Sequence, residues 1–267
     1  MNEKKQSCAP ATKFMKAEDF EKQDGTTIHW LGNAGVMINS WGTCVMIDPL
    51  LEGFDMPLLI DMPILPKEVP HLDAVLITHC DNDHFSRVTC KNLAPVCKAY
   101  HSTQYVSQLM REEELLGIGH DIGESFVVGD IKATLTPADH AWQNEHKKYN
   151  RVFQFEGYCG FWIETPDGTI WAPGDSRLLE EHLQMPQPDV IIFDFSDDGW
   201  HIGLEGAIKL ANTYPDARLI LSHWGSVDAP NMKAFNANPQ SLYGRVENLS
   251  RVKILAPGEL FKLERSK

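Results

Sequence analysis

The segment ITHCDNDHFS, residues 77–86, holds a high density of side chains that can bind metal ions. Its six central residues, His79 to His84, comprise two histidines, two aspartates, an asparagine and a cysteine, and they follow the apolar run LDAVLIT. Neutral imidazoles and carboxylates are side chains with which proteins hold Zn²⁺, Mn²⁺ and Fe. In an extended loop, residues 79 and 81 can face one cation while residues 83 and 84 turn toward another. The segment therefore indicates ligands divided between two neighbouring cations.

Three more candidate ligands stand where other apolar runs end: TLTPADH ends at His140, TIWAPGD at Asp175 and LILSH at His223. Functional side chains gather at the carboxyl ends of strands, because loops can vary there while the sheet fixes their position. The combined set is larger than one ion requires, and it suits two ions that share one carboxylate. Such a pair of cations lowers the pKa of a bound water and supplies it as hydroxide. The candidate ligands are His79, Asp81, Asp83, His84, His140, Asp175 and His223.

Short strands are the main elements expected to hold these ligands. The runs TTIHWLG, VMINSW and CVMIDP predict an antiparallel meander, and LDAVLITH predicts a strand buried on both faces. Apolar residues at helical spacing predict helices over residues 103–116 and 204–214. Further strands are expected at residues 125–130, 131–140, 151–157, 160–165, 169–175, 189–196, 217–223 and 252–263.

This order of elements predicts an α/β fold in which two sheets pack together with helices outside, giving four layers. Residues 26–267 are expected to form a single domain. Residues 1–25 are expected to be a polar tail or a leading strand, and residues 54–70 a proline-rich loop.

The composition of the 267-residue chain excludes several classes of protein. Hydrophobic residues make up 43% and charged residues 23%, as in ordinary globular proteins. The formal net charge of −13 argues against non-specific binding to nucleic acid or to an anionic membrane surface. No run approaches the roughly 20 apolar residues of a membrane-spanning helix, and the first residues lack the apolar core of a signal peptide. Because the six cysteines are also spread without a CxxC pair, we expect a cytoplasmic protein with reduced thiols.

Five segments, in this order, resemble the motifs of the metallo-β-lactamase superfamily of hydrolases: IHWLGNAGVMINSWGTCVMIDP, HCDNDH in the place of the HxHxDH motif, ADH, PGDS and SHWG. The similarity spans about residues 26–260. Within the superfamily, the chain is most similar to the ascorbate-6-phosphate lactonase-like branch of bacterial metal-dependent hydrolases. The resemblance implies an αββα sandwich with the metal centre at one edge of the two sheets.

The resemblance also implies how the ligands divide between two ions. Asp175 would bridge the ions, and Asp48 would lie beneath them and orient ligands through hydrogen bonds. The first ion would be held by His79, residue 81 and His140, and the second by Asp83, His84 and His223.

Residue 81 is where the chain departs from the family, because it is Asp where the motif has His. A carboxylate is a harder ligand than an imidazole, and it shifts the first site toward Mn²⁺ or Fe over Zn²⁺. The carboxylate can also bind the first ion more weakly than an imidazole would, or orient another ligand without contacting the ion. The flavin-associated diiron branch of the superfamily carries a carboxylate there, but this chain has no room for the flavodoxin domain of that branch. We take Asp81 as a ligand.

Other residues near the motifs are candidates for substrate contact. His201 follows SDDGW and precedes an expected helix, so it is either a residue at the start of that helix or, as the resemblance implies, a contact to the substrate or the transition state. Asp198 and Trp200 share its loop. The loop after His140 is either solvated or a pocket wall, and in the second case its basic residues would receive an anionic group such as phosphate. The candidates from this loop are Trp142, His146, Lys147, Lys148 and Arg151.

These observations predict a metallo-hydrolase with two divalent cations, Zn²⁺, Mn²⁺ or Fe, whose bound hydroxide attacks a small ester, lactone or phosphoester. Asp83 or Asp175 would orient the hydroxide or accept its proton, and His201 would donate to a substrate oxygen. The expected partner is a small molecule, anionic if the basic loop lines the pocket, and not nucleic acid or a membrane; a homo-oligomer stays open. The alternatives are a diiron-type oxidoreductase, motivated by Asp81, and an RNA or phosphodiester nuclease, against which the acidic charge speaks.

Overall fold

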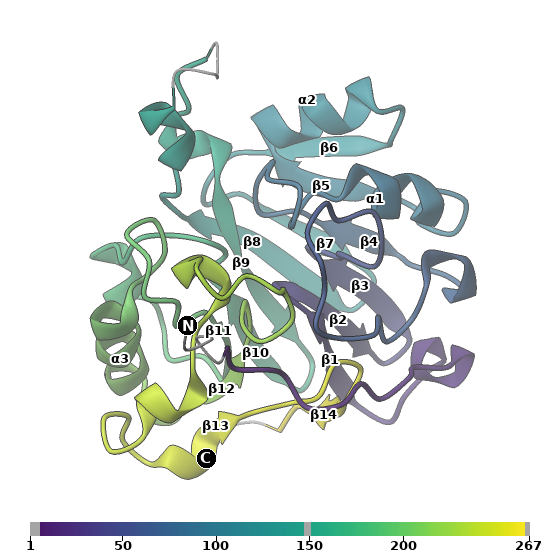
Figure 1. The fold of residues 1–267 in the computed structure, drawn as a ribbon. Coiled ribbons are helices and arrows are strands. Elements are labelled where there is room, and N and C mark those ends of the chain that lie inside the picture. Colours follow the sequence, from purple (N-terminus) through teal and green to yellow (C-terminus); the bar gives the residue numbers. More distant parts are fainter. Residues whose placement is uncertain (1–5, 147–150, 265–267) are drawn as a thin grey trace.

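The computed structural model describes residues 6–146 and 151–264, whose strands form two seven-stranded sheets (Figure 1). The strand order is β14-β1-β2-β3-β4-β5-β6 in the first sheet and β13-β12-β11-β10-β9-β8-β7 in the second. The strands of the first sheet are β1 (Thr26–Gly32), β2 (Gly35–Ser40), β3 (Thr43–Ile47), β4 (Ala74–Leu76), β5 (Tyr100–Thr103), β6 (Gly117–His120) and β14 (Leu260–Lys262). Those of the second are β7 (Ser125–Val128), β8 (Ile131–Pro137), β9 (Cys159–Thr165), β10 (Gly168–Ala172), β11 (Val190–Phe193), β12 (Arg218–Leu221) and β13 (Val252–Lys253).

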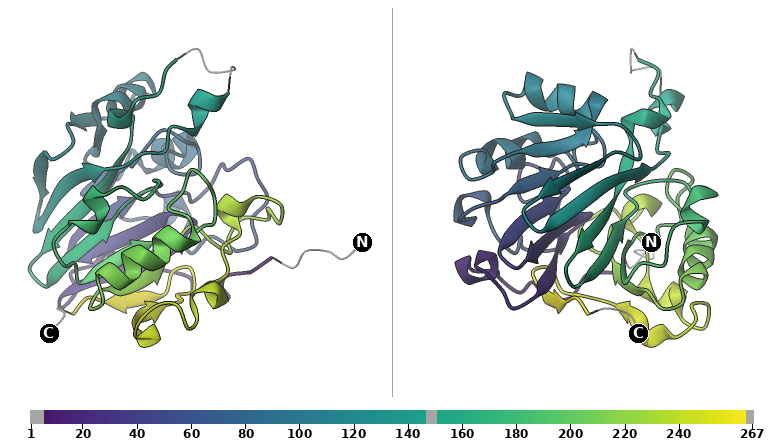
Figure 2. Two further views of the ribbon diagram at one scale, coloured as in Figure 1. Left: turned by 90° about the vertical axis from the view of Figure 1, so that its left-hand side faces the viewer. Right: turned by 180° about the vertical axis from the view of Figure 1, so that it is seen from behind.

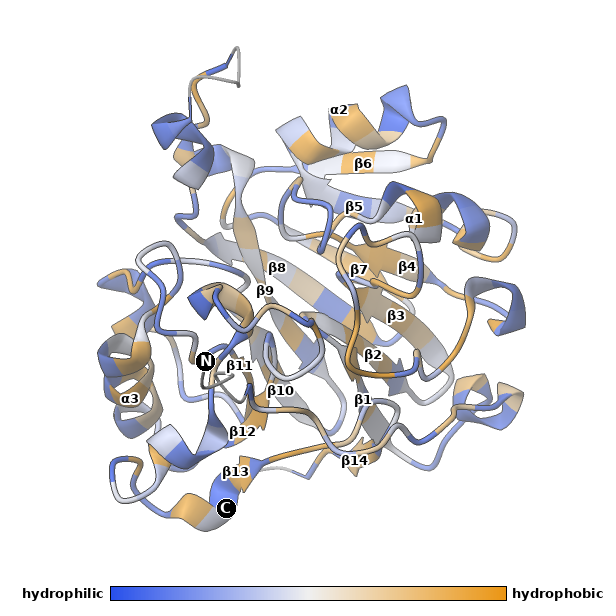
Figure 3. Ribbon diagram, in the orientation of Figure 1, coloured by the Kyte–Doolittle hydropathy of each residue, from blue (hydrophilic) through white to orange (hydrophobic). Residues whose placement is uncertain are grey.

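Strands β1 to β4 of the first sheet are buried on both faces. On β2, Val36 and Ile38 belong to the core shared with the second sheet, while Met37 belongs to a separate core on the opposite face. On β4, Leu76 and Val75 divide between the two cores in the same way. Burial on both faces is why these strands are near-continuous apolar runs in the sequence, and hydrophobic residues follow the strands in Figure 3.

Within residues 6–146 and 151–264, three α-helices cover the outer faces of the sheets: α1 (Arg87–Leu93), α2 (Gln104–Glu112) and α3 (Leu204–Thr213). From α2, Val106 and Met110 pack in the outer core of the first sheet, and from α3, Ala207 and Leu210 pack against the second sheet. The two sheets thus lie between helices, as Figure 2 shows from two sides, and the predicted four-layer αββα fold is confirmed. In the part of the chain that the structure describes, no helix has the length and apolar character needed to cross a membrane.

The predicted antiparallel meander is confirmed in β1, β2 and β3, but two other predictions need correction. The helix expected over residues 103–116 is shorter, because β5 extends to Thr103, whose hydroxyl accepts a hydrogen bond from the Val106 amide and caps α2. The strand expected over residues 151–157 is wrong, because Phe155–Gly157 form a 3-10 helix. There the Asn144 side chain bonds both the N–H and the C=O of Phe153, at 2.8 Å each, where a strand would need a neighbouring strand.

The described residues before β1 lie along the body of the protein and contain no strand. A 3-10 helix spans Ala17–Phe20, and Phe20 is fully buried. Backbone hydrogen bonds from Ala9 to Gly225 and from Lys13 to Pro257 join this segment to loops of the core. All six cysteines are free.

Candidate metal centre

The predicted ligands come together at one edge of the two sheets, in loops that follow strand ends. His79, His140, Asp175 and His223 follow the last residues of β4, β8, β10 and β12 by two or three positions. Both β8 and β10 pair antiparallel with β9, and β10, β11 and β12 are parallel to one another, so these strands of the second sheet end at the same edge. This shared edge is why ligands distant in the sequence become neighbours.

Two groups of one aspartate and two histidines form beside Asp175, and in each group the potential ligand atoms lie within 4.8 Å of one another. A third group meets the same limit and takes one histidine from each of these two: His79, His84 and Asp175. In the first group, Asp81 Oδ2 is 3.4 Å from His79 Nε2 and 3.7 Å from His140 Nε2. In the second group, Asp83 Oδ2 is 3.3 Å from His223 Nε2 and 3.6 Å from His84 Nε2. The first and second groups have the same composition as the two ligand sets that the sequence resemblance implies.

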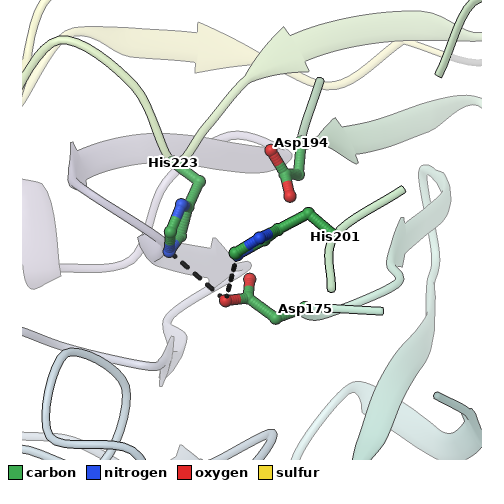
Figure 4. A group of neighbouring side chains, drawn as sticks. All are labelled: Asp175, Asp194, His201 and His223. Carbon is green, nitrogen blue, oxygen red and sulfur yellow. Dashed lines mark hydrogen bonds and ion pairs between the residues drawn. The ribbon is translucent and has the colours of Figure 1, made fainter. Parts of the chain in front are cut away.

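Asp175 lies between the two groups. Its Oδ2 is 3.1 Å from His84 Nε2 and 3.4 Å from His223 Nε2, both of the second group, and 3.9 Å from His140 Nε2 of the first. The same oxygen is 2.9 Å from His201 Nε2, and Figure 4 shows His201 and His223 converging on it. One carboxylate oxygen therefore contacts imidazoles of both groups.

The imidazoles are oriented by hydrogen bonds on their outer nitrogens. His140 Nδ1 donates to the Trp200 carbonyl at 2.7 Å, and His223 Nδ1 donates to the Ala234 carbonyl at 2.9 Å. Because a carbonyl oxygen can only accept, the proton of each neutral ring lies on Nδ1, and Nε2 keeps a free lone pair toward the cluster. This is the tautomer that a metal ligand requires.

Asp48 orients the other two imidazoles from beneath the cluster. Its Oδ2 accepts hydrogen bonds from Thr78 Oγ1 at 2.6 Å and from His84 Nδ1 at 2.8 Å, and its Oδ1 accepts from the Thr78 amide at 2.8 Å. Since the Thr78 hydroxyl proton goes to Asp48, His79 Nδ1 donates to Thr78 Oγ1 at 3.0 Å. His79 and His84 therefore also present Nε2 to the centre.

The carboxylates and imidazoles of the cluster shift one another's pKa values. Burial acts to raise the pKa of Asp175, but His223, His84 and His201 outweigh burial and hold that pKa well below its usual range. Burial acts to lower the pKa of His84, but the carboxylates around it, Asp175 first, raise that pKa well above its usual value. For His140, burial prevails and lowers the pKa to about 4. Carboxylates that are ionised in this way attract cations of any kind.

The donor set fits divalent metal ions. His79 Nε2 is buried and has no hydrogen-bond partner among the described residues, although it is directed at Asp81 and His140. A lone pair left unpaired in the protein interior is costly unless a ligand satisfies it. Imidazole nitrogens together with carboxylate oxygens are a donor set that Zn²⁺, Mn²⁺ and Fe accept.

A cavity of about 740 Å³ opens over the cluster. Of the predicted substrate contacts, Trp142, Asp198, Trp200 and His201 line it, and so does His146. Arg151 is not among the lining residues, and its guanidinium carbon lies 3.3 Å from the centre of the Tyr105 ring. The predicted Lys147 and Lys148 lie outside the described residues. Aromatic and other apolar side chains form much of the cavity wall: Phe54, Met56, Tyr105, Leu109, Phe153, Met232 and Phe235.

Two residues of the centre escaped the sequence analysis. Asp194 directly follows β11, and it forms a further group with Asp175, His201 and His223 (Figure 4). Its Oδ2 is buried without a hydrogen-bond partner among the described residues. The rule that identified His223 at the end of its strand also applies to Asp194, so the signal was present. Gln143 donates to Asp81 Oδ1 at 2.6 Å, and no sequence pattern marks it.

Known proteins resemble the chain in sequence and fold. The family model described as Beta-lactamase superfamily domain matches residues 43–224. A UPF0173 metal-dependent hydrolase of Archaeoglobus fulgidus is 25% identical over 248 residues, which cover 89% of this chain and 99% of that protein. A possible metal-dependent hydrolase from Veillonella parvula shares the fold with a TM-score of 0.70 at 20% identity, covering 90% of this chain and 99% of that one.

A solved structure of a protein with a different activity also shares the fold. CmlA, a diiron beta-hydroxylase from Streptomyces venezuelae, has a TM-score of 0.68 at 12% identity, and the alignment covers 91% of this chain and 55% of CmlA. At this identity the likeness concerns the fold alone. The family model, in contrast, spans more than half of this chain. The chain therefore belongs to the metallo-β-lactamase superfamily, as a metal-dependent hydrolase.

Proposed function

We propose that the protein hydrolyses a small ester, lactone or phosphoester with two divalent cations bound side by side. The observation that carries this proposal is the pair of three-residue groups on either side of Asp175 Oδ2. Seven donors divided in this way exceed the needs of one ion, and a shared carboxylate is typical of paired sites.

When bound, two such cations would supply Lewis acidity and a water activated for attack at a carbonyl carbon or at phosphorus. The first group, with Asp81, and the second, with Asp83, would each hold one ion, and Asp175 would bridge them. Both groups then contain two imidazoles and one carboxylate, a set that favours Fe or Mn²⁺ more than an all-histidine site does.

The chain's own residues would orient the reactants. Asp83 lines the cavity, and although burial acts to raise its pKa, His84 and His223 lower that pKa, so the carboxylate is ionised. We assign to Asp83 the orientation of the attacking water. His201 also lines the cavity, with Nδ1 3.2 Å from Asp198 Oδ1. We assign to His201 a hydrogen bond to a substrate oxygen that gains charge in the transition state.

A diiron oxidoreductase is the second candidate, and the carboxylate Asp81 favours it because two-histidine, one-carboxylate sites bind non-haem iron. The fold is compatible, since CmlA is a diiron beta-hydroxylase. Optical and Mössbauer spectra through a cycle of reduction and reoxidation separate the two functions. Irons that change oxidation state during substrate turnover would support the oxidoreductase, whereas turnover at a redox-silent centre would support the hydrolase.

The decisive experiment combines metal content with a substrate screen. Purified protein loaded with Mn²⁺, Fe²⁺ or Zn²⁺ is expected to hold two equivalents and to hydrolyse members of one class among esters, phosphodiesters and lactones. Sugar-phosphate lactones belong in the screen because the sequence resembles a lactonase branch. His84→Ala is expected to lose bound metal and at least about a hundredfold in turnover, since even a partner behind the ligands is worth 10–100-fold. His71→Ala, a histidine that precedes β4 at its far end, is the matched control. Full metal content and full activity in His84→Ala would refute the proposal.

A further inference from the structure

The carboxylate of Asp81 accepts a hydrogen bond on each of its two oxygens. Trp142 Nε1 donates to its Oδ2 at 2.6 Å, and Gln143 Nε2 donates to its Oδ1 at 2.6 Å. The Tyr158 hydroxyl in turn donates to Gln143 Oε1 at 2.6 Å. Gln143 and Tyr158 are both about 1% exposed, so solvent does not compete for these hydrogen bonds.

This chain of hydrogen bonds determines which group can occupy position 81. In the structure Gln143 Oε1 accepts from the Tyr158 hydroxyl, and the amide presents its N–H₂ to residue 81. The Trp142 indole is a donor and never an acceptor. Two donors from different residues thus point at position 81, and a carboxylate can accept both. A neutral imidazole has one acceptor nitrogen, and that nitrogen would be needed for the metal.

The hydrogen bonds also determine which oxygen faces the metal ligands. Gln143 engages Oδ1, whereas Oδ2 is the oxygen nearest His79 Nε2 and His140 Nε2. Oδ2 has a second lone pair besides the one that accepts from Trp142, so it can still bind a cation. Asp81 is therefore held so that Oδ2 can serve as a ligand while it accepts from Trp142, and Oδ1 is engaged by Gln143.

We infer that Gln143 and Tyr158, together with the Trp142 indole, are positioning residues that fix Asp81 as a one-oxygen ligand and thereby set the affinity of the first cation site. The inference rests on the proposed two-cation function. It also accounts for the departure from the family motif at residue 81, because the environment of that residue suits a carboxylate. Hydrogen bonds to an ionised acceptor are the stronger kind, and loss of such a partner behind a metal ligand typically costs 10–100-fold in affinity.

The test measures Mn²⁺ binding by equilibrium dialysis and by electron paramagnetic resonance, which together resolve two stepwise affinities without reference to activity. Gln143→Leu keeps the approximate size of the side chain and removes the donor. It is expected to weaken one of the two sites by about 10–100-fold and to leave the other within about twofold. Tyr158→Phe is the milder variant, expected to weaken the same site by about 2–10-fold. Gln108→Leu, on the exposed face of α2, is the matched control and should change neither affinity.

A double-mutant cycle distinguishes positioning from a general effect on folding. Asp81→Ala should weaken the same site that Gln143→Leu weakens, and adding Gln143→Leu to Asp81→Ala should change its affinity by less than about threefold. Wild-type protein that binds two ions, while Gln143→Leu and Tyr158→Phe lower only the unfolding temperature, would overturn this inference and leave the proposed function standing. Wild-type protein that binds fewer than two ions would overturn both.

Discussion

Asp48→Asn is the substitution that most directly tests how the centre is organised. The aspartate is buried and accepts three hydrogen bonds, from the Thr78 amide, the Thr78 hydroxyl and His84 Nδ1. An asparagine of the same shape offers one oxygen and one N–H₂ group. If its oxygen keeps the bond to the Thr78 amide, its N–H₂ faces His84 Nδ1, which must then accept and carry its proton on Nε2. In that tautomer His84 cannot bind a metal.

The size of the effect follows from the contacts that change. Loss of a partner behind a metal-binding histidine costs about 10–100-fold in affinity, which corresponds to about 1.4–2.8 kcal/mol of binding free energy. Folding should also suffer, because hydrogen bonds to a charged acceptor contribute about 1.5–3 kcal/mol. Asp48→Asn should therefore weaken the site of the second group, which contains His84, more than the site of the first.

The assay is a calorimetric titration that measures metal affinity, and urea unfolding of the metal-free protein measures stability in parallel. Asp189→Asn is a matched control, since Asp189 accepts hydrogen bonds from the amide at 2.8 Å and the hydroxyl at 3.1 Å of a single threonine, Thr169, at the opposite end of β11. The control should lose stability without losing metal affinity. If both variants lose stability to a similar extent and Asp48→Asn binds two ions as tightly as the wild type, Asp48 has no role in orienting His84.

Three further outcomes are expected. Removal of metal with a chelator should lower the Tm by about 5–10 °C relative to protein in a free metal concentration of 100 times the Kd. At that concentration metal binding adds about 2.7 kcal/mol to the free energy of unfolding. Scanning calorimetry measures the Tm, and an unchanged value would mean that no metal binds to the folded state. Burial and the adjacent His120 lower the pKa of His101 in the folded protein to about 4. In the unfolded chain this pKa is about 6.5, so between pH 4 and pH 6.5 the unfolded chain binds more protons than the folded protein. Protonation of His101 should therefore remove up to about 3 kcal/mol of stability as the pH falls from 6.5 to 4. Urea unfolding of wild type and His101→Leu should differ in pH dependence across that window, and parallel curves would contradict this. Gly160→Ala should destabilise the protein by about 1–3 kcal/mol and weaken metal binding, because the added carbon would lie 2.5 Å from the Pro173 carbonyl, just before Asp175; full stability in thermal unfolding would show that this loop can adjust.

The sequence was informative about the centre because its rule needs no knowledge of strand order. A polar side chain just after a buried strand lies at a sheet edge, whichever strands are neighbours, and this is why His140, Asp175 and His223 could be grouped before the pairing of β8, β10 and β12 was known. Applied to every strand, the same rule would have included Asp194. The rule could not identify Gln143, because its partners Asp81 and Tyr158 lie in loops whose mutual approach depends on the packing of both sheets.

Secondary structure was predictable where burial imposed a period, and less so elsewhere. The meander of β1 to β3 was evident because its residues are apolar and turns separate its strands. Residues 153–156 alternate apolar and polar side chains like a strand, yet the neighbouring Val152 is 73% exposed and β9 already has a partner strand on each side. The Asn144 side chain bonds the Phe153 backbone there, and backbone hydrogen bonds from Gly157 to Gln154 and from Tyr158 to Phe155 form a turn. A period of two therefore predicts a strand only where a neighbouring strand can pair with it.

The residue types that lie against the buried carboxylates distinguish a metal-binding cluster from one that only stabilises the fold. In the described residues, the central carboxylates of Asp81, Asp83 and Asp175 lie against histidine nitrogens, and no ion pair joins them to a lysine or arginine. A buried cluster that only stabilised the fold would be better neutralised by arginine, which keeps its charge at every physiological pH and bonds carboxylates with two parallel N–H groups. An imidazole is a weaker permanent partner, but it can give up its proton and bind a metal in the same position. Histidine on every side of the carboxylates therefore fits a site that exchanges protons for metal ions. His223→Arg should neutralise the carboxylates and abolish metal binding at the second group, which metal titration would measure.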